Sequence, residues 1–349
     1  MMIQADLPLL SQALQDHIQA QLDQKTKPLG SLGRIEELAV RMATIQDTDQ
    51  PELTRPTLVV FAGDHGIAQA GVSPFPQSVT VAMVRNFASG GAAINVLTRA
   101  LGWELVLVNS GTLEETPFPG VWDRRLGAGT RSFDQEAAVQ PDEYSRALAA
   151  GAAVARDLHA NGCRLLALGE MGIGNSSAAA MLIHYLCDAP LASVISRGAG
   201  CDDQQLENKL KVLEAARQFH GPIEEPDEVL RRFGGFEMIM AAGCMLEAAR
   251  LRMPIVIDGL IMSSAALAAI KACPNLLAYT VFAHRSSALG HDILLEHLGQ
   301  KPLLDLGMRL GEGSGAALAL PLLQSSVAIL RDMATFASAE VASRIETAE

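Results

Sequence analysis

Aromatic residues and cysteine are scarce in this chain of 349 residues. Aromatics make up 4% of the sequence, and there are five cysteines. The cysteines are widely scattered and form no Cys-x-x-Cys pair, so we expect reduced thiols in a cytoplasmic protein. The shortage of aromatics, together with 30 glycines, favours close-packed helices on a sheet over a β-sandwich.

Basic clusters and long apolar runs are also missing. No stretch of Lys and Arg exceeds two residues, and the net charge is −12. Because duplex-binding proteins carry a basic face, we expect no nucleic-acid partner. No apolar run approaches the roughly 20 residues that span a bilayer, so no membrane association is expected. Met1–Asp6 lack a basic stretch followed by an apolar core, so no signal peptide is expected.

The composition is typical of a folded protein. Hydrophobic residues make up 49% of the chain and charged residues 19%, a balance that excludes disorder for most of its length. At roughly 150 residues per domain, the length predicts about two domains.

Six short apolar runs have the length of strands that are buried on both faces. They are Thr57–Ala62, Glu104–Val108, Arg164–Leu168, Pro254–Ile257, Ala278–Phe282 and Pro302–Leu306. Segments rich in Ala and Leu lie between several of them, as at Ser176–Leu186, Phe236–Arg250 and Ser263–Lys271. This alternation predicts an α/β fold with a mostly parallel, six-stranded, Rossmann-like sheet flanked by helices. The strand order stays open.

The two ends of the chain show no strand pattern. Leu10, Leu14, Ile18 and Leu22 recur every four residues and predict one apolar stripe on a helix. After Gly315 the chain is again helical, with a break expected at Pro321. We therefore predict a small helical domain built from residues 1–25 and 316–349, beside a large α/β domain of residues 26–315.

The turn after the third run is the sharpest candidate for chemistry. It reads Leu168-Gly169-Glu170-Met171-Gly172-Ile173-Gly174-Asn175-Ser176. Glycines allow close approach of a ligand to the backbone, and the amides of a following helix favour an anion. The spacing matches neither a P-loop nor a dinucleotide fingerprint. A tight turn capped by Asn175 or Ser176 is the structural alternative, although Glu170 is an unusual residue for that purpose.

A second acid, Glu312, lies between two glycines after the last run. A carboxylate held in a partly dry pocket can have a raised pKa and act as a general base. The alternative is a solvated loop acid ahead of a helix.

Two further segments are open to more than one interpretation. Asp64-His65 suggests a metal only weakly, since no further ligands follow at the right spacing. The stretch from Phe75 to Gln77 fits either a rigid wall for a flat ring or an ordinary surface turn. Lys209 and Lys211 lie on a mixed-charge helix that can equally be a solvated face.

Together these segments resemble the nicotinate-nucleotide–dimethylbenzimidazole phosphoribosyltransferases, which make the lower-ligand nucleotide of cobalamin. The similarity covers nearly the whole chain in order. The matching stretches are Thr26-Lys27-Pro28-Leu29-Gly30-Ser31-Leu32-Gly33-Arg34, Gly63-Asp64-His65-Gly66, Gly169–Asn175, Gly198-Ala199-Gly200, Asp258-Gly259, Ala283-His284 and Gly311-Glu312-Gly313-Ser314-Gly315.

The resemblance implies a homodimer that converts nicotinate mononucleotide and 5,6-dimethylbenzimidazole into α-ribazole 5′-phosphate and nicotinate, without metal or cofactor. Glu312 would be the general base, and Glu170 would border the nucleotide as the second catalytic carboxylate. The residues expected to bind nucleotide or phosphate are Gly172, Ile173, Gly174, Asn175, Ser176, Gly198, Gly200, Lys209 and Asp258. Those expected to bind the base are Phe75, Gln77, Met171 and Leu310.

Three rival interpretations stay open at this point. A phosphoribosyltransferase of the same fold could prefer another base, such as adenine or a phenol. A catalytically silent relative could bind nucleotide as a carrier or sensor, although Glu170 and Glu312 argue against it. A dinucleotide-dependent oxidoreductase is disfavoured by the glycine spacing.

Overall fold

The computed structural model describes residues 6–198 and 200–342, and its centre is a parallel sheet of six strands. The strands are ordered β3-β2-β1-β4-β5-β6. In the central part of the sheet Thr57 on β1 lies opposite Glu104 on β2 and Leu166 on β4. The predicted α/β class is confirmed. Strand bounds are β1 Thr57–Gly63, β2 Glu104–Gly111, β3 Trp122–Asp123, β4 Leu166–Met171, β5 Ile255–Ile257 and β6 Thr280–Phe282.

One predicted strand is wrong. Pro302–Leu306 makes a single isolated bridge, between His284 and Leu304, in place of a strand. The backbone of Leu303 and Leu304 bonds to Phe282, Ala283 and Arg285, whereas the Pro302 carbonyl accepts from the Arg34 guanidinium at 2.5 Å. The sixth strand is β3, whose two residues have no apolar run that a sequence pattern could detect.

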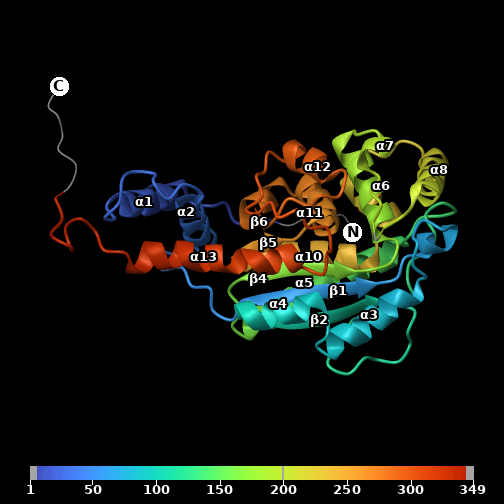
Figure 1. The fold of residues 1–349 in the computed structure, drawn as a ribbon, viewed down its shortest axis with the longest axis horizontal. Helices are drawn as coiled ribbons and strands as arrows, with labels where there is room; N and C mark the ends of the chain where they lie inside the picture. The colour runs from blue at the N-terminus through green and yellow to red at the C-terminus, as the bar shows by residue number, and fades with distance from the viewer. Residues whose placement is uncertain (1–5, 199, 343–349) are drawn as a thin grey trace.

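Helices cover both faces of the sheet (Figure 1). On one face lie α5 (Pro141–Ala160), α10 (Phe236–Arg250) and α11 (Leu260–Ala272), and on the other lie α3 (Ser78–Ala88), α4 (Ala93–Leu101) and α13 (Ser314–Asp332). The remaining elements are η1 Gly66–Ala70, α6 Asn175–Cys187, α7 Leu191–Val194, α8 Asp203–His220, α9 Pro226–Phe233, η2 Pro274–Tyr279 and α12 His291–His297.

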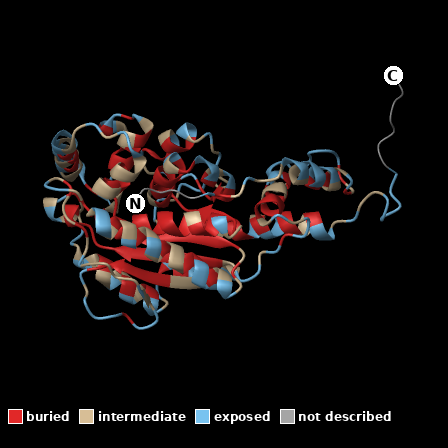
Figure 2. Ribbon diagram, turned by 180° about the vertical axis from the view of Figure 1, so that it is seen from behind, coloured by how far each residue is buried: buried red, intermediate tan, exposed pale blue. Residues whose placement is uncertain are grey.

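The strands and the helices against them form a tightly packed core. Figure 2 shows the strands buried along most of their length. Helices α5 and α10 meet at two glycines, because a Cβ on Gly151 would overlap the Met240 carbonyl and one on Gly243 would overlap that of Leu148. The abundance of glycine therefore serves helix contact here, as well as turns.

A small helical cluster lies beyond one end of the sheet, where α1 (Gln12–Asp23), α2 (Arg34–Gln46) and the end of α13 come together (Figure 1). Its buried core is made by Ile18, Leu22, Ala39, Ala43 and Leu330. An antiparallel backbone bridge between Lys25 and Thr335 joins the segment after α1 to the segment after α13. The helix α2 belongs to this cluster although it falls inside the range assigned to the large domain. The domain division stays a prediction, and residues 1–5 and 343–349 of it lie outside the described structure.

Helix α13 is continuous through Pro321, where the sequence predicted a break. Proline cannot donate to the carbonyl four residues earlier, which is that of Ala317. The Trp103 indole Nε1 donates to this carbonyl instead, at 2.9 Å, and so replaces the missing hydrogen bond. Among the described residues α13 is the one helix long and apolar enough to cross a membrane, but 56% of that window is buried inside the fold.

Candidate active site

Four acidic side chains gather where the parallel strands end. Glu170 is the next-to-last residue of β4, where it pairs with β1. Asp258 follows β5, Asp64 follows β1, and Glu312 lies in the loop before α13. All four are buried. Ligands of parallel sheets bind beyond the carboxyl ends of the strands, so this is the place at which the chemistry is expected.

Glu312 is held in a backbone conformation that few side chains adopt. Its φ is +63°, and the flanking Gly311 and Gly313 have φ of +86° and +85°. Its Oε2 accepts a hydrogen bond from the Ile94 amide, at 3.3 Å, in the first turn of α4. Burial and the nearby Asp258 charge raise the pKa of Glu312, and the Ile94 amide partly opposes them. A carboxylate shifted upward in this way is a stronger proton acceptor than a solvated one.

Glycines bring the Glu312 loop against β4. A Cβ on Gly169 would lie 2.5 Å from the Glu312 carbonyl, and a Cβ on Gly311 would overlap the Glu170 carboxylate. The two acids that the sequence singled out are therefore neighbours across this contact. Any side chain at Gly169 would push them apart.

Glu170 is a carboxyl group that burial keeps largely neutral. Burial, followed by the charges of Asp258 and Glu237, raises the pKa of Glu170 to about 8, against a hydrogen bond from Asn175 that acts in the opposite direction. At pH 7 the unliganded site therefore holds Glu170 protonated. A cation bound beside it would favour the ionised form.

The turn from Gly172 to Ser176 leads into α6, and no side chain caps that helix. Its N-cap residue, Gly174, has a φ of +104°. The Lys209 ammonium, on α8, donates to Ser176 Oγ at 2.8 Å and to the Ser196 carbonyl at 3.2 Å. Gly198 lies against the same Ser176 hydroxyl. A helix start and a lysine thus converge on one spot, an arrangement that suits an anion.

Lys209 is fully buried, so the solvated-face alternative is wrong for it. Burial lowers the pKa of Lys209 to about 8. No carboxylate within the described residues forms an ion pair with it, whereas the exposed Lys211 pairs with Glu207 at 2.8 Å. A buried cation with only neutral partners is costly unless an anion joins it.

Asp258 has its oxygens occupied by backbone amides. Oδ1 accepts from Gly315 at 2.8 Å and from Ala316 at 3.0 Å, and Oδ2 accepts from Gly313 at 3.2 Å. Asp258 therefore caps α13 from a neighbouring strand and fixes the loop that carries Glu312.

The four residues predicted to bind the base lie in different environments. Met171 packs with Val84 and Phe118 in a small apolar cluster at the end of β1. Gln77 donates to the His65 carbonyl at 2.9 Å. Phe75 and Leu310 are 47% and 57% exposed.

Sequence reasoning missed several residues of this region. Val84 lies on the apolar face of α3 and Phe118 lies in a loop, so neither had a motif. Glu237, in the first turn of α10, is fully buried, and its Oε1 is 2.6 Å from His65 Nε2. The sequence around Glu237 has an ordinary helical pattern and no motif that would mark it as a site residue. Within residues 6–198 and 200–342, no three His, Cys, Asp or Glu side chains are arranged to hold a metal ion.

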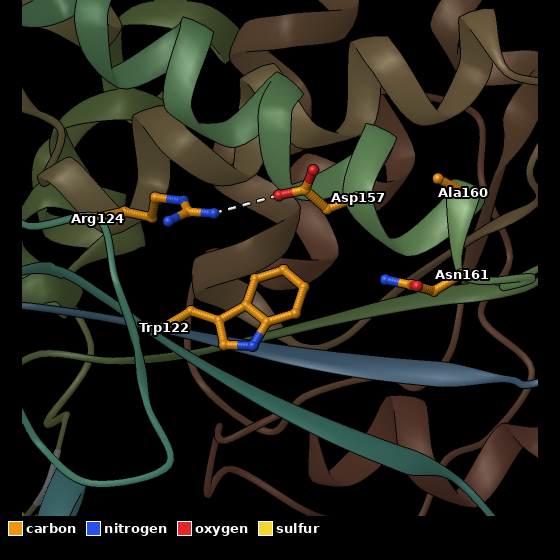
Figure 3. A pocket seen from close by; sticks show the side chains of 5 residues that line it. All are labelled: Trp122, Arg124, Asp157, Ala160 and Asn161. Carbon is orange, nitrogen blue, oxygen red and sulfur yellow. Dashed lines mark hydrogen bonds and ion pairs between the residues drawn. The ribbon is translucent and has the colours of Figure 1, made fainter.

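Two surface pockets lie away from these groups. One, of about 380 Å³, is beside the edge strand β3 and is lined by Trp122, Arg124, Asp157, Ala160 and Asn161 (Figure 3). The other, of about 460 Å³, lies between α2 and β6. No predicted site residue lines either pocket.

Comparisons with known proteins agree over nearly the full chain. A family model described as "Phosphoribosyltransferase" matches residues 7–341. A relative from Ralstonia nicotianae, named nicotinate-nucleotide–dimethylbenzimidazole phosphoribosyltransferase, is 52% identical over 96% of each chain. A relative of the same name from Cupriavidus necator is 49% identical over 95% of this chain and 96% of its own. The crystal structure of CobT from Thermus thermophilus is 41% identical, with a TM-score of 0.90 over 95% of this chain and 99% of that one.

Proposed function

The chain belongs to the phosphoribosyltransferase family of these relatives, and on that premise we propose that it transfers the phosphoribosyl group of nicotinate mononucleotide to 5,6-dimethylbenzimidazole. The products would be α-ribazole 5′-phosphate and nicotinate, for assembly of the cobalamin nucleotide. The named relatives support the pair of substrates. The observation that carries the chemistry is the buried Glu312 beside Glu170 at the carboxyl ends of the strands.

The leaving group explains why no metal is called for. In the donor, the ring nitrogen bonded to ribose is a pyridinium, so nicotinate departs with a neutral pyridine nitrogen. A pyrophosphate leaving group would instead require charge neutralisation, commonly by magnesium. The transfer can therefore proceed with this chain's own side chains.

Glu312 is the proposed general base. When one nitrogen of the benzimidazole attacks the ribose carbon, the ring becomes cationic unless its other N–H loses the proton. A carboxylate within hydrogen-bond reach of that N–H is sufficient, and the raised pKa of Glu312 suits the task. Attack on the face opposite to the departing nicotinate inverts the β-linkage to α.

Glu170 is proposed to face the positive charge of the donor and of the transition state. The donor's pyridinium would lower the pKa of this carboxyl from about 8, so that its proton is released to solvent. The resulting carboxylate would stabilise positive charge at the ribose carbon as the glycosidic bond breaks. Alignment of the two rings across that carbon supplies much of the remaining rate.

The phosphate of the donor is assigned to the start of α6. The backbone of Gly172–Ser176 would approach it, Lys209 would supply the counter-charge, and the loop containing Gly198 and Gly200 would add close contacts. Asp258, also expected at the nucleotide, holds the loop that carries Glu312. Met171 and Gln77, with Phe75 and Leu310 at the entrance, are proposed to contact the base. A homodimer is proposed for the assembly.

The direct test is an assay of purified protein with nicotinate mononucleotide and dimethylbenzimidazole in the presence of EDTA, with α-ribazole phosphate and nicotinate as products. Product formation supports the transferase and excludes a required divalent metal. Nicotinate release that depends on another added base would assign a different acceptor. Binding of both ligands without product would point to a non-catalytic relative.

A further inference from the structure

No proposed step of the transfer uses the pair formed by His65 and Glu237. His65 follows β1, the strand next to β4, and Glu237 lies in the first turn of α10. His65 Nε2 donates to Glu237 Oε1 at 2.6 Å, and both side chains are fully buried. Replacing a buried pair by apolar side chains is often neutral or stabilising, so stability alone is a weak reason for placing one here.

His65 contacts the turn that is assigned to the donor. A Cβ on Gly172 would lie 3.3 Å from His65 Nε2, and a Cβ on Gly174 would lie 3.1 Å from His65 Cβ. The imidazole therefore packs against the Gly172–Gly174 turn. Gly235 confines it from the other side, since a Cβ there would overlap the ring and the Glu237 carboxylate.

The backbone of the same residue holds a group that is assigned to the acceptor. Gln77 Nε2 donates to the His65 carbonyl, at 2.9 Å, just before α3 begins. His65 thus contacts the Gly172–Gly174 turn, assigned to the donor, through its ring, and accepts a hydrogen bond from Gln77, assigned to the acceptor, at its carbonyl.

We propose that His65, held in place by Glu237, is a positioning residue. It keeps the Gly172–Gly174 turn and Gln77 at the distance from each other that the transfer requires. The inference rests on the proposed function and adds to it. Aligned rings contribute to rate only while their separation stays within a few tenths of an ångström of the reactive geometry. A loosened His65 therefore affects binding of both substrates and the rate of transfer together.

Glu237 has a second, electrostatic influence that a test can use. Burial is the main cause of the raised pKa of Glu170, the charges of Asp258, Glu237 and Glu312 add to it, and the hydrogen bond from Asn175 lowers it. Glu237→Gln removes the charge but keeps an oxygen that can accept from His65 Nε2. It should therefore keep the geometry and lower the pKa of Glu170.

The experiment measures kcat and both KM values across a pH series, together with the melting temperature. His65→Ala should lower kcat by tenfold or more and raise both KM values, and His65→Gln, which keeps a donor toward Glu237, should recover part of the loss. Glu237→Gln should move the acid side of the pH profile to lower pH. The matched controls are His220→Ala, which loses a bond to the Phe133 carbonyl, and Glu247→Gln, on the same helix but paired with Arg250.

The proposal is overturned if His65→Ala and His65→Gln change the kinetic constants no more than His220→Ala at a similar loss of melting temperature. An unmoved pH profile in Glu237→Gln would also contradict it. Should His65→Ala fail to fold, His65→Gln and Glu237→Gln give the answer. Failure of the proposed function is distinct, because the wild-type protein would then transfer nothing while donor binding, measured by calorimetry, could still be compared among the variants.

Discussion

Glu312 combines an unfavourable backbone conformation with a buried carboxylate. A non-glycine residue at positive φ costs about 1–3 kcal/mol and is retained where the surroundings fix it. Here Asp258 fixes the loop by accepting from Gly313 and Gly315. The conformation orients the carboxylate toward the first turn of α4, where the Ile94 amide donates to it.

Glu312→Gln tests this role with little change of shape. The amide cannot take the proton, so we expect kcat to fall by about 10²–10⁴-fold, while donor affinity stays close to that of the wild type. Steady-state kinetics and calorimetric titration with nicotinate mononucleotide measure the two quantities. Turnover at the wild-type level would remove Glu312 from the mechanism.

Lys209→Ala tests the phosphate site. A charge-assisted hydrogen bond contributes about 1.5–3 kcal/mol, so donor binding should weaken by roughly tenfold to a hundredfold, with a smaller effect on the acceptor. Lys211→Ala is the matched control, because Lys211 is two residues away on α8 and 71% exposed at its side chain. Equal donor affinity in the two variants would refute the assignment.

At the scale of elements, Pro321 is accommodated in the middle of α13. The Ala317 carbonyl that proline leaves without its helical donor is satisfied by the Trp103 indole. Trp103 immediately precedes β2, so a residue at the start of a strand completes the hydrogen bonding of a helix that covers the sheet.

Trp103→Phe leaves that buried carbonyl unpaired and should lower the free energy of unfolding by about 1–3 kcal/mol beyond the loss of packing. Pro321→Ala restores a backbone N–H at the helical position. It should therefore be more stabilising in the Trp103→Phe protein than in the wild type. Urea denaturation of the two single variants and the double variant gives the coupling energy, and additive effects would count against the interaction.

Five of the six predicted strands and the principal helices followed from apolar runs and helical periodicity. The failures have local causes. Pro302–Leu306 resembles a strand but makes a single bridge at Leu304, with its Pro302 carbonyl bound by Arg34, and β3 is too short to form a pattern. Pro321 did not end its helix because the Ala317 carbonyl, which loses its helical donor, accepts a hydrogen bond from the distant Trp103.

The site was predictable where acids stand among glycines. Glu170 and Glu312 lie in such contexts, and the structure brings them together. Glu237 and Phe118 carry no sequence signal, because only tertiary packing places them near the carboxyl ends of the strands. Lys209 was ambiguous for the same reason, since its burial depends on the loop from Ser196 to Gly198.

At the scale of the whole molecule, buried acids make stability depend on pH. The pKa of Glu170 is about 8 in the folded protein, against 4.5 as its ordinary value. The folded state therefore keeps a proton that the unfolded chain has lost. Its stabilising contribution is complete below pH 4.5 and is lost as the pH rises toward 8.

Glu170→Gln removes this dependence. Relative to the wild type, the variant should gain stability steadily from pH 5 to pH 8.5, by at most roughly 1.4 kcal/mol for each pKa unit of the shift. Glu247→Gln should behave in the opposite way, because Arg250 lowers the pKa of Glu247 and its ionised form is the stabilising one. Urea denaturation midpoints at pH 5 and pH 8.5 measure these stability differences. Parallel pH profiles for the wild type and Glu170→Gln would contradict the raised pKa of Glu170.

Helix α13 has 19 residues and is about 28 Å long at 1.5 Å per residue. Its first turn is fastened beside Glu312, and near its far end Leu330 is part of the small helical core with Ile18 and Leu22. The helix therefore joins the loop that carries Glu312 to the small helical cluster that it forms with α1 and α2. A tilt of this cluster would move α13, so α1 and α2 are mechanically connected to Glu312, the proposed proton acceptor.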